Sequence, residues 1–349
     1  MKPIFLFSLP RSGSTLTQRI LAAHPEISTV SEPWILLPLR YMHRETGVYA
    51  EYNHDRAAHA IADVIAQLPY GKADFDKAVR QFVEGLYNDL KGPESTTYFL
   101  DKTPRYDLIV EDIFQVFPDA KFIFLWRNPL AVAASLIDSW GSGKWNLYEY
   151  TDQLYNAPRR LVEAFQSHAG NSLSLRYEDL VQNPLDEIHR ICDYLALPYD
   201  DKMASDFTAV QLNGRMGDTI GTRKYEAISQ EPLNKWQETM GSKIRSNWCR
   251  NYIRQIGPEV MTGMGYDSND MLATVDSLSQ STARLGSDIA RMSLGKHLWM
   301  LRAWYLIKGH NSSAARRLAS AFRNRLAAAE RAAVRTEAVT QAPEKAGRH

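Results

Sequence analysis

The stretch FLFSLPRSGSTLTQRIL, residues 5–21, constrains the fold more than any other part of the chain. It begins with an apolar run, passes through a turn that contains Gly13, and continues with a pattern typical of a helix. A short, continuous apolar run predicts a strand that is buried on both faces, as in a parallel sheet. The helix after such a strand presents free backbone N–H groups at its first turn, where an anion can bind.

Strand and helix patterns continue to alternate after this segment. Apolar runs predict strands at residues 97–100, 121–126 and 172–177, and helical spacing predicts helices at 106–116 and 129–139. Alternation of this kind implies right-handed crossovers between parallel strands. The predicted fold class is therefore α/β: a P-loop-type parallel sheet flanked by helices on both faces, with a C-terminal helical extension.

Two amphipathic helices are predicted between residues 34 and 95. The apolar side of the first consists of Ile61, Val64, Ile65 and Leu68. That of the second, which follows the candidate capping residue Asp74, consists of Phe75, Val79, Phe82, Val83, Leu86 and Leu90. An apolar stripe of this kind is typical of a helix face that packs against a core.

The composition changes after Tyr266, where a polar segment rich in Ser and Asp begins. The predicted organisation is an α/β domain at 1–266, a polar linker at 267–290, and a basic helical extension and tail at 291–349. From Arg284 to the end, 13 Lys or Arg stand against 4 Asp or Glu, so this part carries +9 although the whole chain carries +1.

The basic C-terminal part allows two interpretations. Its charge, together with Trp299, Trp304 and Tyr305, favours peripheral contact with an anionic membrane surface or an acidic partner. Alternatively, it is a solvated helix that packs on the rest of the chain or on a second subunit, which leaves a homodimer open. Nucleic acid is not an expected partner, because no base-reading motif accompanies the charge.

Cysteine usage and hydropathy indicate a cytoplasmic chain. The two cysteines, Cys192 and Cys249, lack the spacing of a metal site and predict no dependence on disulfides. The apolar run after Lys2 is shorter than a secretory signal requires. No run approaches the ~18 apolar residues of a membrane span.

The segment SLPRSGST, residues 8–15, nearly matches the Walker pattern G-x-x-x-x-G-K-[ST]. Gly13 and Thr15 match it, whereas Ser8 and Ser14 stand at the positions of the first glycine and the lysine. Without that lysine, and without a later strand that ends in an Asp to hold Mg²⁺, a magnesium triphosphate substrate is disfavoured.

The same loop still carries the groups that hold an anion. The hydroxyls of Ser12, Ser14 and Thr15 and the charge of Arg11 would add to the backbone N–H groups and the helix dipole. A nucleotide whose terminal group has a lower charge than a triphosphate fits this set. The alternative is an ordinary strand-to-helix turn, because short Gly/Ser turns are common.

A second candidate anion site follows the strand predicted at 121–126. Arg127 lies just past the carboxyl end of this strand, where open α/β sheets bind their ligands. Ser135 falls eight residues later on the next helix, so the two side chains can converge on a second phosphate. Alternatively, Arg127 caps a helix in a solvent-exposed ion pair.

Together these two motifs resemble those of the sulfotransferase family, whose donor is 3′-phosphoadenosine 5′-phosphosulfate. The resemblance covers roughly residues 3–240 and is closest to the tyrosylprotein and carbohydrate branches. It implies that the phosphosulfate is bound by Arg11, Ser12, Gly13, Ser14 and Thr15, and the 3′-phosphate by Arg127 and Ser135. Sulfuryl transfer needs neither the Walker lysine nor Mg²⁺, so no metal is expected.

The resemblance also implies catalytic roles. Glu32 matches a glutamate that takes the proton of the acceptor hydroxyl, and Lys102 matches a lysine that steadies the transition state, together with Arg11. The alternatives are that Glu32 bonds a local backbone amide before Pro33, and that Lys102 pairs only with Asp101 or reaches solvent.

Further donor contacts are implied by later segments. Tyr177 matches a tyrosine that contacts the nucleotide, while Glu178 is expected to cap the next helix. Residues 217–236 resemble a loop that closes over the donor, and its cations are Arg223, Lys224 and Lys235, of which Lys235 is the main candidate. Ser139 stands where the tyrosylprotein branch has an arginine, which weakens assignment to that branch.

The predicted function is transfer of the sulfuryl group to a hydroxyl of a carbohydrate or similar acceptor. Glycan, lipid, phenol and peptide tyrosine all remain open as acceptors. Residues 34–95 are expected to build the acceptor site, where Trp34, Tyr41, Tyr49 and Tyr52 either stack on the acceptor or belong to the core. The alternatives are a divergent P-loop small-molecule kinase and a non-catalytic nucleotide-binding adaptor at membranes.

Overall fold

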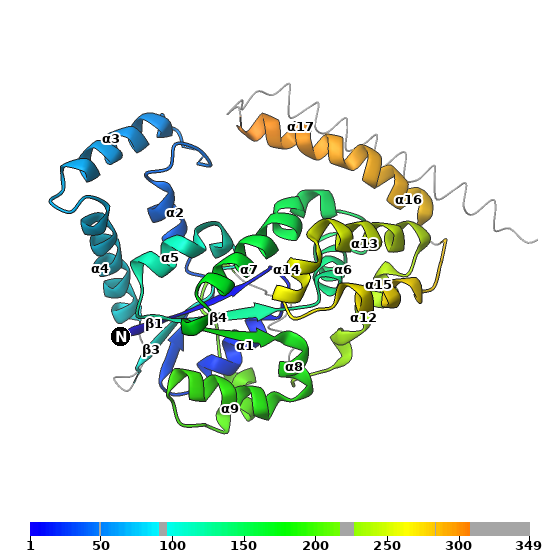
Figure 1. Ribbon diagram of the computed structural model, residues 1–349, viewed down its shortest axis with the longest axis horizontal. Helices are drawn as coiled ribbons and strands as arrows, with labels where there is room; N and C mark the ends of the chain where they lie inside the picture. The colour runs from blue at the N-terminus through cyan, green and yellow to red at the C-terminus, as the bar shows by residue number, and fades with distance from the viewer. Residues whose placement is uncertain (49, 91–95, 217–226, 283, 308–349) are drawn as a thin grey trace, which may run out of the picture. The chain divides into compact units, whose positions relative to one another are not determined.

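The computed structural model describes residues 1–48, 50–90, 96–216, 227–282 and 284–307 (Figure 1). These residues form two compact units. The first consists of Met1–Asn128, Gln153–Leu233 and Glu259–Tyr266, and the second of Pro129–Asp152, Asn234–Pro258 and the chain from Asp267 onward. The domain boundaries expected at 266 and 290 stay a prediction.

A parallel sheet of five strands forms the centre of the first unit, in the order β2-β3-β1-β4-β5. The strands are β1 (Lys2–Ser8), β2 (Ile27–Thr29), β3 (Tyr98–Asp101), β4 (Lys121–Trp126) and β5 (Ser172–Arg176). The four pairings among them are parallel. Helices of the first unit pack on both faces of this sheet, which confirms the predicted α/β fold class.

One face of the sheet is aliphatic. Ile4 and Leu6 of β1 point to this face and form a buried cluster with Leu16 of α1 (Ser14–Ala22) and Ile191 of α9 (Pro184–Leu195). The alternation of side chains along a strand sends the residues between them to the opposite face. The helix that carries the loop of residues 8–15 is therefore fixed to the sheet by its apolar side.

The opposite face of the sheet is aromatic. Phe7 of β1 packs 6.2 Å from Phe114 of α5 (Val110–Val116), measured between ring centroids. Phe124 of β4 lies 5.4 Å from Phe165 of α7 (Ala157–Ser167) in an edge-to-face contact. In Figure 1, α5 and α7 lie on the side of the sheet opposite to α9.

The remaining elements surround the sheet or belong to the second unit. In the first unit they include α2 (Leu36–Tyr41), α3 (His54–Gln67), α4 (Lys72–Leu90), η1 (Tyr106–Ile109), α8 (Tyr177–Gln182), α10 (Lys202–Ser205), η4 (Ala169–Asn171), η5 (Phe207–Ala209) and η6 (Glu231–Leu233). In the second they include α6 (Pro129–Trp140), η2 (Leu147–Tyr150), α12 (Lys235–Met240), α13 (Lys243–Ile256), α15 (Ser268–Asp276), α16 (Leu285–Ala290), η7 (Arg291–Gly295) and α17 (Lys296–Ile307). Two helices, η3 (Asp152–Asn156) and α14 (Pro258–Gly263), begin at the last residue of a segment of the second unit and continue into the first unit.

A buried ion pair organises the second unit. Arg245 of α13 donates to both carboxylate oxygens of Asp288 on α16, at 2.6 and 2.9 Å. The same guanidinium donates to the carbonyl of Gly143, so α13, α16 and the turn after α6 are joined.

The segment expected to be a polar linker, residues 267–290, contains the helices α15 and α16. Over the residues that the structure describes, none of the helices is both long enough and apolar enough to cross a membrane.

The apolar sides predicted for α3 and α4 are only partly buried. In α4, Val79 and Val83 are buried as expected, but Phe82 is 54% exposed. In α3, Val64 is 60% exposed, because this helix extends away from the sheet, as Figure 1 shows. Leu90, at the end of α4, is also exposed. The prediction was right about the helices and wrong about these three side chains, since an apolar stripe does not specify which partner covers it.

Truncation of Phe114 should destabilise the first unit strongly. The Phe114 ring lies 3.9 Å from both Phe122 and the stacked ring of His168, so Phe114→Ala leaves a cavity in the aromatic face. We expect a loss of about 3–5 kcal/mol in the free energy of unfolding, measured by urea denaturation followed by circular dichroism. Tyr70→Ala, at a side chain that is 80% exposed, is the control and should change little. Equal losses of stability in the two variants would contradict the packing of Phe114 in the aromatic face.

Candidate functional site

The candidate site lies at the carboxyl edge of the sheet in the first unit. Because the strands are parallel, the residues that follow them meet at one edge. The loop 9–13 follows β1, Glu32 follows β2, Lys102 follows β3, Arg127 follows β4 and Tyr177 follows β5. The structure therefore brings most of the predicted site residues to the same edge.

The loop after β1 has, at Gly13, a backbone conformation that favours glycine. Gly13 has φ of 87° and immediately precedes α1. A Cβ atom built on Gly13 would lie 2.3 Å from Cδ2 of Tyr177, which is too close for any side chain. Arg11 also has a positive φ, of 66°, a conformation that is uncommon for non-glycine residues and typical of functional loops.

Buried hydroxyl groups accompany the start of α1. Ser12 is 1% exposed, and its Oγ makes no hydrogen bond to the residues that the structure describes; the same holds for Oγ of Ser8. Ser14 and Thr15, the first two residues of α1, are also buried. Buried polar atoms normally have partners, so these hydroxyls are suited to hold a ligand. The helix N-terminus favours one with negative charge.

Arg127 lies against the loop after β1. Its Nη1 donates to the carbonyl oxygen of Arg11 at 2.8 Å, and its guanidinium lies 4.4 Å from the centroid of the Tyr177 ring. The Arg127 side chain is buried, which excludes the alternative of a solvent-exposed ion pair. Tyr177, itself buried, lies against both Gly13 and Arg127, so it supports both candidate anion-binding motifs.

Glu178 has a role that the sequence did not reveal. Its Oε1 accepts the N–H of Asn128 at 2.9 Å, and its Oε2 accepts the hydroxyl of Tyr266 at 2.7 Å. The prediction that Glu178 caps the following helix was wrong, since both carboxylate oxygens bond other segments. The first bond fixes the residue next to Arg127. The only indication of this role in the sequence was that an acidic residue follows the predicted end of a strand.

Glu32 and Lys102 form an almost fully buried ion pair. Nζ of Lys102 lies 2.7 Å from Oε1 of Glu32, and the side chains are 1% and 9% exposed. The indole N–H of Trp34 donates to the other oxygen, Oε2, at 3.1 Å. The alternative in which Lys102 pairs only with Asp101 or with solvent is therefore wrong. Glu32 bonds these two side chains rather than a local backbone amide.

Gln18 connects the segment before Glu32 to α1, the helix that follows the loop 9–13. Its Nε2 lies 2.8 Å from Oγ1 of Thr29, 2.7 Å from the carbonyl of Val30 and 2.9 Å from that of Ser31. Sequence reasoning missed this residue. Its signal was an amide side chain between the apolar positions of α1, where a buried polar group must find partners.

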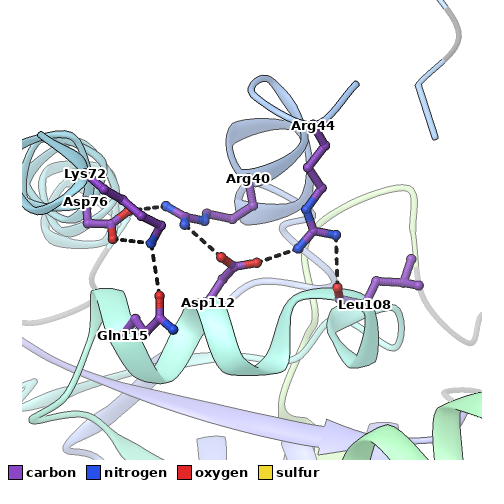
Figure 2. Close-up of polar contacts among 7 residues, drawn as sticks. All are labelled: Arg40, Arg44, Lys72, Asp76, Leu108, Asp112 and Gln115. Carbon is purple, nitrogen blue, oxygen red and sulfur yellow. Dashed lines mark hydrogen bonds and ion pairs between the residues drawn. The ribbon is translucent and has the colours of Figure 1, made fainter. Parts of the chain in front are cut away.

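A network of charges holds α2 in place after Trp34 (Figure 2). Arg40 of α2 is fully buried and donates to Asp76 of α4 at 2.5 Å and to Asp112 of α5 at 2.8 Å. Arg44 donates to the other oxygen of Asp112. Burial would raise the pKa of Asp112, but its bonds to Arg40 and Arg44 lower it below the usual value. The network therefore stabilises the backbone that follows Glu32.

Asp101 is fully buried and is the last residue of β3, so the expectation that no later strand ends in an Asp was wrong. Its Oδ2 accepts the hydroxyls of Tyr87 and Tyr106 at 2.5 and 2.8 Å, and its Oδ1 accepts that of Thr103 at 3.1 Å. Burial raises the pKa of Asp101 to about 6, although these three hydrogen bonds oppose the shift.

This raised pKa predicts an unusual pH dependence of stability. Between pH ~4 and ~6 the folded chain binds a proton at Asp101 that the unfolded chain does not bind, so stability falls as the pH rises. A shift of two units corresponds to about 3 kcal/mol. We expect urea denaturation at several pH values to show this decline, and Asp101→Asn to remove it. A decline that persists in the variant would contradict the assignment.

Ser135 and Lys235 belong to the second unit. Ser135 is half-buried on α6, and Lys235 is the exposed first residue of α12. Their convergence with Arg127 stays a prediction. Arg223, Lys224 and Tyr49 lie outside the described residues, as does the basic tail from residue 308 onward.

The aromatic residues expected around the acceptor have different surroundings. Trp34 is half-buried and bonds Glu32, whereas the Tyr41 ring lies 4.5 Å from the guanidinium of Arg44. Tyr52 is exposed. Only Trp34 among these three contacts a predicted catalytic residue.

Known proteins are similar to this chain in sequence. The profile described as the Sulfotransferase family matches residues 3–201, more than half of the chain. Nodulation protein NoeE of Sinorhizobium fredii is 25% identical over 288 residues, which cover 76% of this chain and 66% of that protein. A putative protein-tyrosine sulfotransferase of Caenorhabditis briggsae is 26% identical over 261 residues, which cover 66% of this chain and 84% of that protein.

Among solved structures, the sulfotransferase domain of the Synechococcus PCC 7002 olefin synthase is similar to this chain. It superimposes with a TM-score of 0.47 at 23% identity, over 67% of this chain and 87% of that domain. The family match itself includes the loop after β1, Glu32, Lys102, Arg127 and Tyr177, but ends before Lys235.

Proposed function

Because the chain belongs to the sulfotransferase family of enzymes, we propose that it transfers a sulfuryl group from 3′-phosphoadenosine 5′-phosphosulfate to a hydroxyl of a carbohydrate or similar acceptor. The observation that carries this proposal is the contact between the two anion-binding motifs. Arg127 donates to the backbone of the loop that contains Arg11, and Tyr177 packs against both. Two anion-binding groups in contact suit a nucleotide with two separate phosphate groups.

The residues after β1 would bind the phosphosulfate end. The N-terminus of α1 and the buried hydroxyl of Ser12 offer neutral donors, and Arg11 adds one positive charge. Arg127 would bind the 3′-phosphate end. The expected contribution of Ser135 to this phosphate, and that of Lys235 to covering the donor, stay predictions. This set has no residue in the role of the Walker lysine, which favours a donor that reacts without a metal-bound triphosphate.

Glu32 and Lys102 would perform the transfer. The acceptor oxygen attacks the sulfur, the bond from sulfur to the bridging phosphate oxygen breaks, and adenosine 3′,5′-bisphosphate leaves. Glu32 takes the proton of the acceptor hydroxyl, while Lys102 and Arg11 compensate the negative charge that develops on the leaving oxygen. The 2.7 Å ion pair supports this assignment, because it holds the base beside the cation that the reaction needs.

The acceptor side is proposed at residues 34–95. Trp34 contacts Glu32 and is only half-buried, so its ring can stack on a sugar face next to the base. Cytoplasmic location is proposed from the two buried free cysteines. Membrane contact and a homodimer through the basic tail remain predictions.

Titration calorimetry tests the donor assignment. Adenosine 3′,5′-bisphosphate should bind with a micromolar dissociation constant, and Arg127→Ala should weaken it by roughly 100-fold, as loss of a charge-assisted bidentate contact does. A preference for ATP with Mg²⁺ would favour the kinase alternative instead.

A second experiment identifies the acceptor. ³⁵S-labelled donor is incubated with a chitooligosaccharide, a tyrosine peptide, a simple phenol and a glycolipid, and sulfated product is separated from donor. We expect label in the oligosaccharide. Binding of the bisphosphate without transfer to any of them would favour the adaptor alternative.

A further inference from the structure

We propose that Asp101 is a positioning residue, which orients the hydroxyls of Thr103 and Tyr106 so that they hold the backbone of residues 34–36 and, through it, the base Glu32. The proposal rests on the proposed function, because it concerns the geometry of that base. Asp101 itself lies behind the site, at the end of β3, and touches neither Glu32 nor the face of Trp34 in the described contacts.

The polarity of the hydrogen bonds around Asp101 is fixed by its charge. An ionised carboxylate has no proton to donate, so Thr103 and Tyr106 must each use their single hydroxyl proton to bond it. The lone pairs of the two hydroxyls are then free to accept. Thr103 accepts the backbone N–H of Trp34 at 3.3 Å, and Tyr106 accepts that of Leu36 at 3.4 Å.

These two amides flank the segment that carries the base. Trp34 has φ of 56°, a left-handed conformation that an aromatic residue adopts only when its surroundings impose it. In this conformation its indole N–H reaches Oε2 of Glu32, while Lys102, the residue after Asp101, bonds Oε1. Both contacts of Glu32 therefore depend on segments that Asp101 joins.

Tyr87 offers a matched control. Its hydroxyl also bonds Oδ2 of Asp101, at 2.5 Å, but it comes from α4 and bonds neither residue 34 nor residue 36 in the described contacts. Tyr87→Phe thus removes one hydrogen bond of Asp101 without touching the connection to the base. Thr103→Val removes a hydrogen bond of Asp101 and the acceptor for Trp34 together.

Hydrogen–deuterium exchange and turnover test the proposal in the full chain. In Thr103→Val, the peptide that contains Trp34 and Leu36 should exchange faster, and kcat with the acceptor found by the ³⁵S screen should fall roughly 10- to 100-fold, the size expected for a misplaced catalytic group. The dissociation constant of adenosine 3′,5′-bisphosphate should stay within twofold. Thr103→Ser restores the hydroxyl and should restore both exchange and kcat.

The controls separate this inference from the proposed function. Tyr87→Phe should lower the unfolding midpoint but leave exchange at Trp34 and kcat unchanged; an equal fall in kcat would mean that general destabilisation explains the effect and would overturn the inference. If Glu32→Gln abolishes turnover while Thr103→Val retains it, the inference alone fails. If Glu32→Gln retains turnover, Glu32 is not the base, so the inference and the role proposed for Glu32 both fail, whereas sulfuryl transfer itself stands.

Discussion

Replacing Glu32 by glutamine should lower kcat by about 100- to 10,000-fold, the contribution typical of a positioned general base. Glutamine keeps the size of the side chain and can still accept the indole N–H of Trp34. It cannot accept the proton of the acceptor hydroxyl. Steady-state kinetics with labelled donor and saturating acceptor would measure the loss.

The same substitution, Glu32→Gln, should not weaken binding of the product nucleotide. Lys102 is almost fully buried against Glu32, so the neutral glutamine leaves its positive charge uncompensated. Adenosine 3′,5′-bisphosphate, which is an anion, should then bind equally well or more tightly. A parallel loss of nucleotide binding and turnover would show that Glu32 shapes the donor site rather than acting as the base.

The chain supplies a matched control for this substitution. Glu26 lies just before β2, at the opposite edge of the sheet from Glu32, and bonds the hydroxyl of Thr97. Glu26→Gln changes the same chemical group on the same short segment of the chain. It should leave both kcat and nucleotide binding within twofold of the unchanged enzyme.

The sheet and its site edge were predictable because their signals are local. The strands at 121–126 and 172–176 are continuous or alternating apolar runs, and Arg127 and Tyr177 follow them directly. Parallel pairing then places the residues after each strand at a single edge, whatever the strand order. For the same reason the loop with Gly13 could be located before its conformation was known.

The supporting contacts were not predictable because they connect distant residues. Gln18 bonds residues 29–31, and Asp101 bonds Tyr87, which lies on a helix outside the sheet. Each of these polar residues stands in an apolar pattern, which signals a buried partner but does not identify it. The partner depends on the packing of α1 and α4 on the sheet.

The exposure of α3 has a similar explanation. Its amphipathic pattern correctly predicted a helix, but the structure buries only His54 and Ala58 of its 14 residues. Hydrophobic periodicity reports that a helix has two different sides, and it does not report which surface covers the apolar one.

Substitution of Gly13 by alanine should weaken donor binding strongly. The left-handed backbone at φ of 87° costs an alanine about 1–2 kcal/mol. The new methyl group would also lie 2.3 Å from the Tyr177 ring, which must move, at a further cost of about 1–3 kcal/mol. Because Tyr177 also lies under Arg127, this movement disturbs both anion-binding motifs at once.

Together the two costs are about 2–5 kcal/mol, which corresponds to a loss of roughly 30- to 5,000-fold in affinity for adenosine 3′,5′-bisphosphate if the loop must be restored before the nucleotide binds. Calorimetry would measure it. Gly85→Ala is the control, since Gly85 lies within α4 and its Cβ would meet no heavy atom within 4 Å beyond its chain neighbours and the backbone of its own helix. Alanine there should stabilise the helix by about 0.5–1 kcal/mol and leave binding unchanged.

The double variant Gly13→Ala, Tyr177→Leu separates the two causes. Leucine removes the ring carbons that the new methyl group would meet, but it leaves the left-handed backbone and also removes the surface under Arg127. Binding should therefore stay weak even if stability recovers. Recovery of nucleotide binding in the double variant would mean that Tyr177 acts only through its volume, and that Arg127 does not need its ring to reach the donor.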